Sequence, residues 1–439
     1  MAYALINVRI YDYESYEDNG FIVFDDKIIK KGKMTDYTNE GYEEYDLMGK
    51  LVIPAFVSGH THLYSTFARG MSFDFNPTNF LDILKQLWWK VDHFLDHDLI
   101  YYSSLIGGLN QLSFGTTTLI DHNASGQVKG SLELVKRALV NRLGLRCVTA
   151  FETSDRYDVD EAISENVDGF KRKEKYISSS LFGMHASLSL SDESLRKIRN
   201  NLNDNGIHIH IAESLMDEED CINKYNMRVV ERLEKFQLLN DKSILVHCTH
   251  INEEEMDIIK KYNCVIAVNV TSNLNNAVGI SQIKKFLDKG IRVISGNDGL
   301  IPSQAVEYLN IFYLSHLKEA SPTGFSFDDL KKIIRNTYDY VNNLLGTKLG
   351  RIEEGCEADL LAIDFNNLTP VNESNIFSHL FYGVFPGLKP NWVIASGKIK
   401  FKDYQEYEDY SLDKQEGLIQ ARRLWDKVEE GGNNVKFKY

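Results

Sequence analysis

The chain has 439 residues, of which 43% are hydrophobic and 26% are charged, so it can bury a large core and is not disordered as a whole. Its 49 basic and 63 acidic residues give a net charge of −14, which opposes binding to nucleic-acid phosphates. The five cysteines form no CxxC pair, which fits reduced thiols in the cytoplasm. We find neither a signal peptide nor an apolar run of about 18 residues, so we expect no membrane contact.

The first 50 residues predict a small β unit. Ala4–Ile10 and Gly20–Ile29 are rich in β-formers, and Asp18-Asn19-Gly20 is a turn signal between them. From Leu51 onward, short apolar strands alternate with amphipathic helices such as Ile222–Phe236. The predicted strands are Leu51–His62, Thr116–His122, Arg146–Thr153, Leu181–Ala186, Ile207–Glu213, Ile244–His250, Cys264–Val270 and Arg292–Asp298.

Such alternation is typical of a parallel sheet, and eight units predict a closed (β/α)₈ barrel. An open doubly wound sheet is the alternative that the pattern alone leaves open. Two further helices, Pro302–Glu319 and Phe327–Leu345, are followed by strands at Asp359–Asp364 and Trp392–Ser396. The β-rich ends of the chain can therefore pair into one small domain. An exposed helix at Leu418–Val428 and a polar tail complete the chain.

Histidines mark the ends of two predicted strands. His60 and His62 are two residues apart, so they share one face of a strand and can chelate one cation. On the fifth strand, His208 and His210 share a face and Glu213 follows directly. Alone, the first pair could equally be polar turn residues. For His208 we favour a hydrogen-bonded core histidine, and for His210 a place in the site.

Two more groups lie where predicted strands end. His247 ends the sixth strand and Asp298 the eighth, although a lone histidine is often structural and Asn-Asp-Gly is usually a turn. Barrel active sites lie at the C-terminal ends of the strands. Closure of the barrel brings these ends together, so groups far apart in sequence can meet around one ion.

These motifs resemble those of the amidohydrolase superfamily, and the resemblance covers nearly the whole chain. His185-Ala-Ser and Thr271-Ser-Asn273 resemble its cytosine/guanine deaminase–chlorohydrolase (ATZ/TRZ) branch. The segments 64–71, 87–89 and 273–279 are most similar to the SsnA-type aminohydrolases, a group linked to purine catabolism. The chain departs from the branch at Asn297, where threonine is usual, and at Val270, where proline is frequent.

The resemblance implies a barrel with a β-sandwich built from both chain ends. The expected domains are 1–53 (first part of the sandwich), 54–348 (metal-dependent barrel), 349–405 (second part of the sandwich) and 406–439 (C-terminal helix and tail). The implied metal ligands are His60, His62, His210 and Asp298, holding one divalent ion, Zn²⁺ or alternatively Fe²⁺. Position 185 is histidine rather than a lysine that could bridge two metals, which favours a single ion.

The resemblance also implies roles for the remaining site residues. Asp298 accepts a proton from the water that the metal binds, and His247 orients the resulting hydroxide. Glu213 carries the proton to a ring nitrogen and then to the leaving group. Implied substrate contacts are His185, Arg69 and Asn273.

The expected activity is hydrolysis of a C–N bond in a purine-like N-heterocycle, by deamination. Ring opening of a cyclic amide or ureide uses the same groups and is an alternative. A non-catalytic metal-binding accessory protein is the alternative of another class, against which the intact Glu213 and His247 argue. We expect a small-molecule substrate and a cytoplasmic homodimer or higher homo-oligomer.

Overall fold

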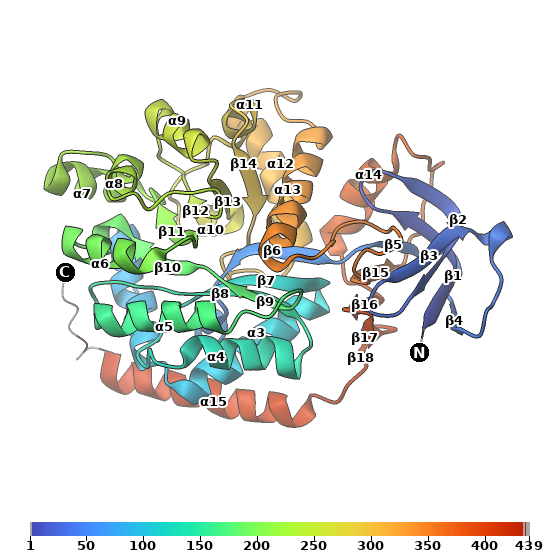
Figure 1. The fold of residues 1–439 in the computed structure, drawn as a ribbon, viewed down its shortest axis with the longest axis horizontal. Helices are drawn as coiled ribbons and strands as arrows, with labels where there is room; N and C mark the ends of the chain where they lie inside the picture. Colours follow the sequence, from blue (N-terminus) through green and yellow to red (C-terminus); the bar gives the residue numbers. More distant parts are fainter. Residues whose placement is uncertain (1, 433–434, 436–439) are drawn as a thin grey trace.

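The computed structural model describes residues 2–432 and 435, and Figure 1 shows an α/β body beside a sheet formed by both ends of the chain. Within these residues the strands form three sheets, one of nine strands, one of five and one of four. We call the largest the mixed sheet, the sheet β6–β9 the first parallel sheet, and the sheet β10–β14 the second parallel sheet.

The mixed sheet joins the two chain ends. Its strands are β1 (Tyr3–Tyr11), β2 (Tyr16–Phe24), β3 (Ile28–Lys33), β4 (Glu43–Asp46), β5 (Leu51–Pro54), β15 (Leu360–Ile363), β16 (Trp392–Ala395), β17 (Lys398–Lys402) and β18 (Gln405–Glu406). The ends meet where β5 pairs antiparallel with β15. The predicted turn at Asp18–Gly20 is wrong, because β2 runs through it. The chain instead turns before β2, where Asp12 Oδ1 accepts a hydrogen bond from Ser15 N at 2.9 Å.

All strand pairs in the two smaller sheets are parallel. The first parallel sheet holds β6 (Phe56–Thr61), β7 (Thr116–Asn123), β8 (Arg146–Phe151) and β9 (Ser178–Ser180). The second holds β10 (Phe182–Ala186), β11 (Ile207–Ile211), β12 (Ile244–His247), β13 (Val265–Val268) and β14 (Arg292–Ser295). Almost every residue of these strands is buried, as expected for parallel strands covered on both faces. The predicted α/β fold with parallel sheets is confirmed.

Hydrogen bonds join the two parallel sheets at both of their edges. On one side Asn297 N, just after β14, donates to His60 O of β6 at 2.9 Å. On the other side Thr153 N, just after β8, donates to Gly183 O of β10 at 3.1 Å. Gly296 permits the first contact, since a Cβ there would lie 2.7 Å from His60 O. The C-terminal ends of strands from both sheets therefore surround one region.

Helices cover the outside of the parallel sheets (Figure 1). The principal ones are α3 (His97–Ser113), α4 (Ser131–Lys136), α5 (Val159–Lys171), α6 (Asp192–Leu202), α7 (Leu215–Tyr225), α8 (Val229–Lys235), α9 (Glu253–Lys261), α11 (Ile283–Asp288), α12 (Gln304–Glu319) and α13 (Phe327–Leu345). Sequence signals fix some of their ends: the Ser326 side chain accepts from Asp329 N at the start of α13, and Gly346 ends it with φ 77°. The single helix predicted at Ile222–Phe236 is wrong, because Asn226, at φ 54°, separates α7 from α8.

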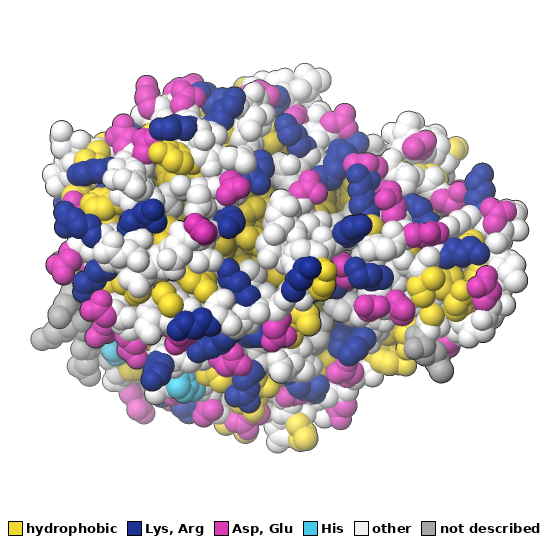
Figure 2. Space-filling model, viewed as in Figure 1, with side chains coloured by type: hydrophobic (Ala, Val, Ile, Leu, Met, Phe, Trp, Pro, Cys, Tyr) yellow, Lys and Arg dark blue, Asp and Glu magenta, His cyan; other side chains and the backbone are white. Residues whose placement is uncertain are grey.

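The C-terminal helix α15 (Ser411–Gly431) contains the predicted helix 418–428 and lies along α3 (Figure 1). Arg423 binds both carboxylate oxygens of Asp96 at 2.7 Å, and Trp425 Nε1 donates to Phe67 O at 2.7 Å. Most of the predicted polar tail lies outside the described residues. Among the described residues, no helix is both long and apolar enough to cross a membrane. On the face shown in Figure 2, acidic and basic side chains are interspersed rather than gathered in one patch.

A buried ion pair fastens the mixed sheet to the first parallel sheet. Arg146, at the start of β8, binds Asp359 at 2.5 Å and Glu357 at 3.0 Å, and all three side chains are at most 5% exposed. We predict that Arg146→Ala lowers the free energy of unfolding by about 3–5 kcal/mol, because the buried carboxylate of Asp359 loses its cation and that of Glu357 keeps only Lys27. Lys171→Ala, which removes an exposed pair with Asp168, should change it by less than about 1 kcal/mol. Urea denaturation of both variants measures the difference, and equal losses would contradict it.

Candidate metal and substrate site

Four groups from three strand ends converge at one point. His60 and His62 come from the end of β6, His210 from β11 and Asp298 from the turn after β14. Their ligand atoms all lie within 4.8 Å of one another. Asp298 Oδ1 is 2.9 Å from His60 Nε2 and 3.2 Å from His62 Nε2. We call these four residues the ligand cluster.

Backbone carbonyls orient two of the imidazoles. His62 Nδ1 donates to His122 O at 2.7 Å, and His210 Nδ1 donates to His185 O at 2.8 Å. A carbonyl oxygen only accepts, so each Nδ1 carries a proton, and in the neutral form of each ring the lone pair lies on Nε2, which faces the cluster. Such outer hydrogen bonds are the usual means of orienting histidine ligands.

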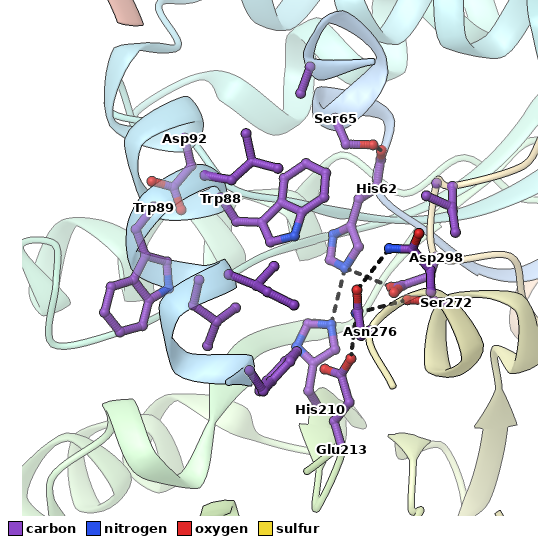
Figure 3. A pocket seen from close by; sticks show the side chains of 18 of the residues that line it. His62, Ser65, Trp88, Trp89, Asp92, His210, Glu213, Ser272, Asn276 and Asp298 are labelled. Atoms are coloured by element: carbon purple, nitrogen blue, oxygen red, sulfur yellow. Dashed lines mark hydrogen bonds and ion pairs between the residues drawn. The ribbon is translucent and has the colours of Figure 1, made fainter. Parts of the chain in front are cut away.

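The two Nε2 atoms face each other at 3.1 Å, with the Asp298 carboxylate beside them (Figure 3). Lone pairs and a carboxylate so close together repel unless a cation lies between them. The donor set of imidazoles and one carboxylate is the one that Zn²⁺ and related transition metals prefer. The residues present therefore fit a divalent metal.

His208 supports the cluster from behind. Its Nε2 lies 2.8 Å from His60 Nδ1, and the ring is fully buried. The hydrogen-bonded core histidine predicted from the sequence thus lies next to a candidate ligand. His122 is also buried behind the cluster, and its Nε2 donates to His208 O at 3.1 Å.

A second group, His62, His122 and Glu152, also brings ligand atoms within 4.8 Å of one another. It shares His62 with the ligand cluster. His62 Nδ1 is already bonded to a carbonyl, so only Nε2 is available, and that atom faces Asp298 and His210. One imidazole nitrogen cannot serve both groups, which favours a single ion.

Glu213 lies beside the ligand cluster but is held by other residues. Its Oε1 accepts from Asn276 Nδ2 at 3.2 Å, and its Oε2 lies 3.5 Å from His247 Nε2. Burial raises the pKa of Glu213, although His247 lowers it in part. A carboxyl group that is easily protonated and adjoins a metal site is suited to carrying protons.

The backbone is strained where the site residues leave their strands. Ala212, His247 and Asp298 all have left-handed φ values, of 45°, 68° and 55°. Asp217 supports the first of these turns, because its Oδ2 accepts from Ala212 N at 3.0 Å and its Oδ1 from Leu188 N at 3.1 Å. Asp217 was not predicted; its position on α7, four residues after Glu213, was the available signal.

A pocket of about 430 Å³ opens beside the ligand cluster. His62, His210 and Asp298 of the ligand cluster line one side together with Glu213, and the segment 71–92 covers the other (Figure 3). The apolar residues of this segment that line the pocket are Met71, Phe75, Pro77, Phe80, Ile83, Leu84, Leu87, Trp88 and Trp89. The volume and the apolar lining suit a small organic ligand.

Of the predicted substrate contacts, His185 and Arg69 line this pocket, with Arg69 exposed. Asn273 is not among the lining residues. It is 2% exposed, and its Oδ1 accepts from His247 Nδ1 at 2.8 Å. The structure therefore places Asn273 behind His247, which it orients, and its neighbour Asn276 lines the pocket instead.

Comparison with known proteins identifies the family. Residues 51–400 match the amidohydrolase family, and the chain belongs to that family, as the sequence motifs predicted. The chain is 27% identical over 407 residues to a protein of Thermococcus sibiricus named 5-methylthioadenosine/S-adenosylhomocysteine deaminase, covering 87% of this chain and 92% of that one. It is also 27% identical to a 5'-deoxyadenosine deaminase of Methanobrevibacter smithii, covering 93% of each.

Solved structures share the fold. An adenosine deaminase from Xanthomonas campestris with bound zinc superposes with a TM-score of 0.83 at 18% identity, covering 97% of this chain and 98% of that one. An atrazine chlorohydrolase from Arthrobacter aurescens complexed with zinc gives a TM-score of 0.76 at 18% identity, covering 95% and 99%.

Because His62 belongs to both groups of candidate ligands, we expect only one metal ion to bind. Protein purified without chelators should contain about one divalent metal per chain. His122→Asn keeps the ligand cluster and should not change this content, whereas His60→Asn should reduce it severely. Elemental analysis by mass spectrometry measures all three proteins. A reproducible content near two, lowered to one by His122→Asn, would show that the second group also holds an ion.

Proposed function

We propose that this amidohydrolase-family protein is a metal-dependent aminohydrolase, which replaces an amino group on an N-heterocycle with a hydroxyl group and releases ammonia. One observation carries the proposal: three members of a cluster that fits a divalent metal, His62, His210 and Asp298, line the same pocket as the protonatable Glu213. The names of relatives that match over most of their length, deaminases of adenine nucleosides, favour deamination over ring opening.

In this proposal His60, His62, His210 and Asp298 hold the metal. We propose Zn²⁺, because the two zinc-containing neighbours share the fold, with Fe²⁺ as the alternative. A bound ion of this kind lowers the pKa of a coordinated water toward about 7, which makes a nucleophile available near neutral pH.

The chain's own groups then move protons. Asp298 is the base that accepts the proton lost by the attacking water. Glu213, protonated at the start, delivers its proton to the ring nitrogen, and the proton held by Asp298 then passes by way of Glu213 to the amine. The C–N bond breaks as ammonia leaves, the new C–O bond remains, and a proton lost from the product returns to Glu213. His247, held by Asn273, lies 3.5 Å from Glu213 and orients the attacking oxygen.

We further propose that the two parallel sheets close into one (β/α)₈ barrel, with β9 and β10 sharing the fourth position. The hydrogen bonds at both edges of the sheets support closure. The proposed domains are those expected from the sequence, 1–53 with 349–405, 54–348, and 406–439. The described cysteines are all buried and free, which supports a cytoplasmic location. A homo-oligomeric state remains an expectation.

The assigned roles predict two different losses. Glu213→Gln should lower kcat by at least about a hundredfold, because it removes a proton carrier, while keeping the metal. His210→Ala should lose both the activity and the metal. Activity assays paired with elemental analysis separate them. A metal-free Glu213→Gln protein would identify Glu213 as a ligand instead.

The product identifies the reaction. Incubation of metal-loaded protein with adenine nucleosides, aminopyrimidines, aminotriazines and cyclic ureides should release ammonia from at least one amino-substituted ring. Product masses should show hydroxyl in place of amine. Addition of a whole water without ammonia would indicate ring opening. No turnover across the panel, with the metal in place, would favour a non-catalytic accessory protein.

A further inference from the structure

A group of buried charges lies in the pocket wall beside the ligand cluster, with an oxygen of Glu152 within 4.8 Å of a ring nitrogen of His62. Arg156 binds Glu152 Oε1 at 2.7 Å and Asp92 Oδ2 at 2.8 Å, and these three side chains are at most 3% exposed. Glu152 follows β8, and Asp92 lies on α2 (Trp89–Phe94). Figure 3 shows Asp92 and Trp89 across the pocket from Glu213 and Asp298. We call Glu152, Arg156 and Asp92 the Glu152 cluster.

The Glu152 cluster has more negative than positive groups. Arg156 is its cation, placed with its guanidinium carbon 4.9 Å from the Trp89 ring and 5.0 Å from the Tyr157 ring. Two carboxylates share this one guanidinium. Among the described residues that line the pocket, the charged ones are Arg69, Asp92, Glu152, Glu213, Asp217 and Asp298. The charged groups of the pocket lining are therefore mostly carboxyl groups, which accept hydrogen bonds when they are ionised.

Glu152 is the carboxylate of this group that stands next to a predicted substrate contact. It lines the pocket, and its Oε1 lies 3.9 Å from His185 Nε2. Burial alone would raise the pKa of Glu152, but the neighbouring His185, His122 and Arg156 together hold it well below its usual value. An ionised carboxylate has several lone pairs and donates nothing, so it can bind Arg156 and still accept from a ligand.

We propose that Glu152 is a specificity-determining residue, which accepts a hydrogen bond from an uncharged donor on the substrate other than the amine that leaves. This inference rests on the proposed function of the same pocket. The donor is either a sugar hydroxyl or an N–H of the ring, because each can donate one hydrogen bond to a carboxylate. A ligand without it leaves the buried carboxylate unsatisfied and should bind more weakly.

Equilibrium binding of reaction products tests this without turnover. Calorimetry on the metal-loaded protein compares inosine with 2',3'-dideoxyinosine, which lacks the sugar hydroxyls, and hypoxanthine with 9-methylhypoxanthine, which lacks the N9–H of the ring. Each ligand is measured with the wild type, Glu152→Gln and Glu152→Asp. A hydrogen bond to a charged group contributes enough that its loss weakens binding about tenfold or more.

We expect Glu152→Gln to weaken the donor-bearing member of one pair by about tenfold or more, and its partner by less than about threefold. The pair that shows this contrast identifies the source of the donor. Glu152→Asp keeps the charge, so its affinity for the donor-bearing ligand should lie between those of the wild type and Glu152→Gln. Glu165→Gln is the matched control, since Glu165 is 2% exposed and accepts from Gly130 N and Leu132 N outside the pocket.

Equal weakening of both members of each pair would show that Glu152 only supports the fold, and would overturn the inference. So would unchanged binding in both variants, or a wild-type protein that binds neither donor-bearing ligand better than its partner. Failure of the proposed function is a separate result: absence of ammonia release by the metal-loaded wild type from every amino-substituted ring of the substrate panel.

Discussion

The site depends on the repulsion between unprotonated imidazole nitrogens and a carboxylate that the fold forces together. The carbonyls of His122 and His185 accept from Nδ1 of His62 and His210, so in the neutral rings the lone pairs lie on the Nε2 atoms, which face each other at 3.1 Å. A cation removes the repulsion, and the surrounding structure is arranged to hold its ligands. Hydrogen bonds between the edges of the two parallel sheets bring Asp298 beside His60. Left-handed turns after three strands aim the reactive groups inward.

Much of the fold could be predicted because it follows from local patterns. Buried parallel strands appear in the sequence as short apolar runs, and amphipathic helices separate them. The errors arose where tertiary pairing overrides local signals. Asp18–Gly20 has the composition of a turn, yet pairing with β1 and β3 keeps it extended. The run Leu51–Thr61 is continuous in hydropathy, but Ala55 divides it between the mixed sheet and the first parallel sheet.

The site was predictable in part for the same reason. Two histidines spaced by one residue at a strand end, or a histidine followed by Glu213, are visible in one short segment. The supporting groups are not. Arg156 and Asp92 are 64 residues apart in sequence, and their contact exists only because α2 packs against the segment after β8. Asn273 was predicted from family resemblance as a substrate contact, whereas packing against β12 turns its amide to His247.

The central claim is that one metal in the ligand cluster is required for hydrolysis of a C–N bond. Its most direct test is to add Zn²⁺ in steps to metal-free protein and follow ammonia release from the best substrate of the panel. The account predicts almost no release without metal, and a linear rise that stops at about one equivalent per chain. Undiminished release by the metal-free protein, or a rise that continues to two equivalents, would contradict it.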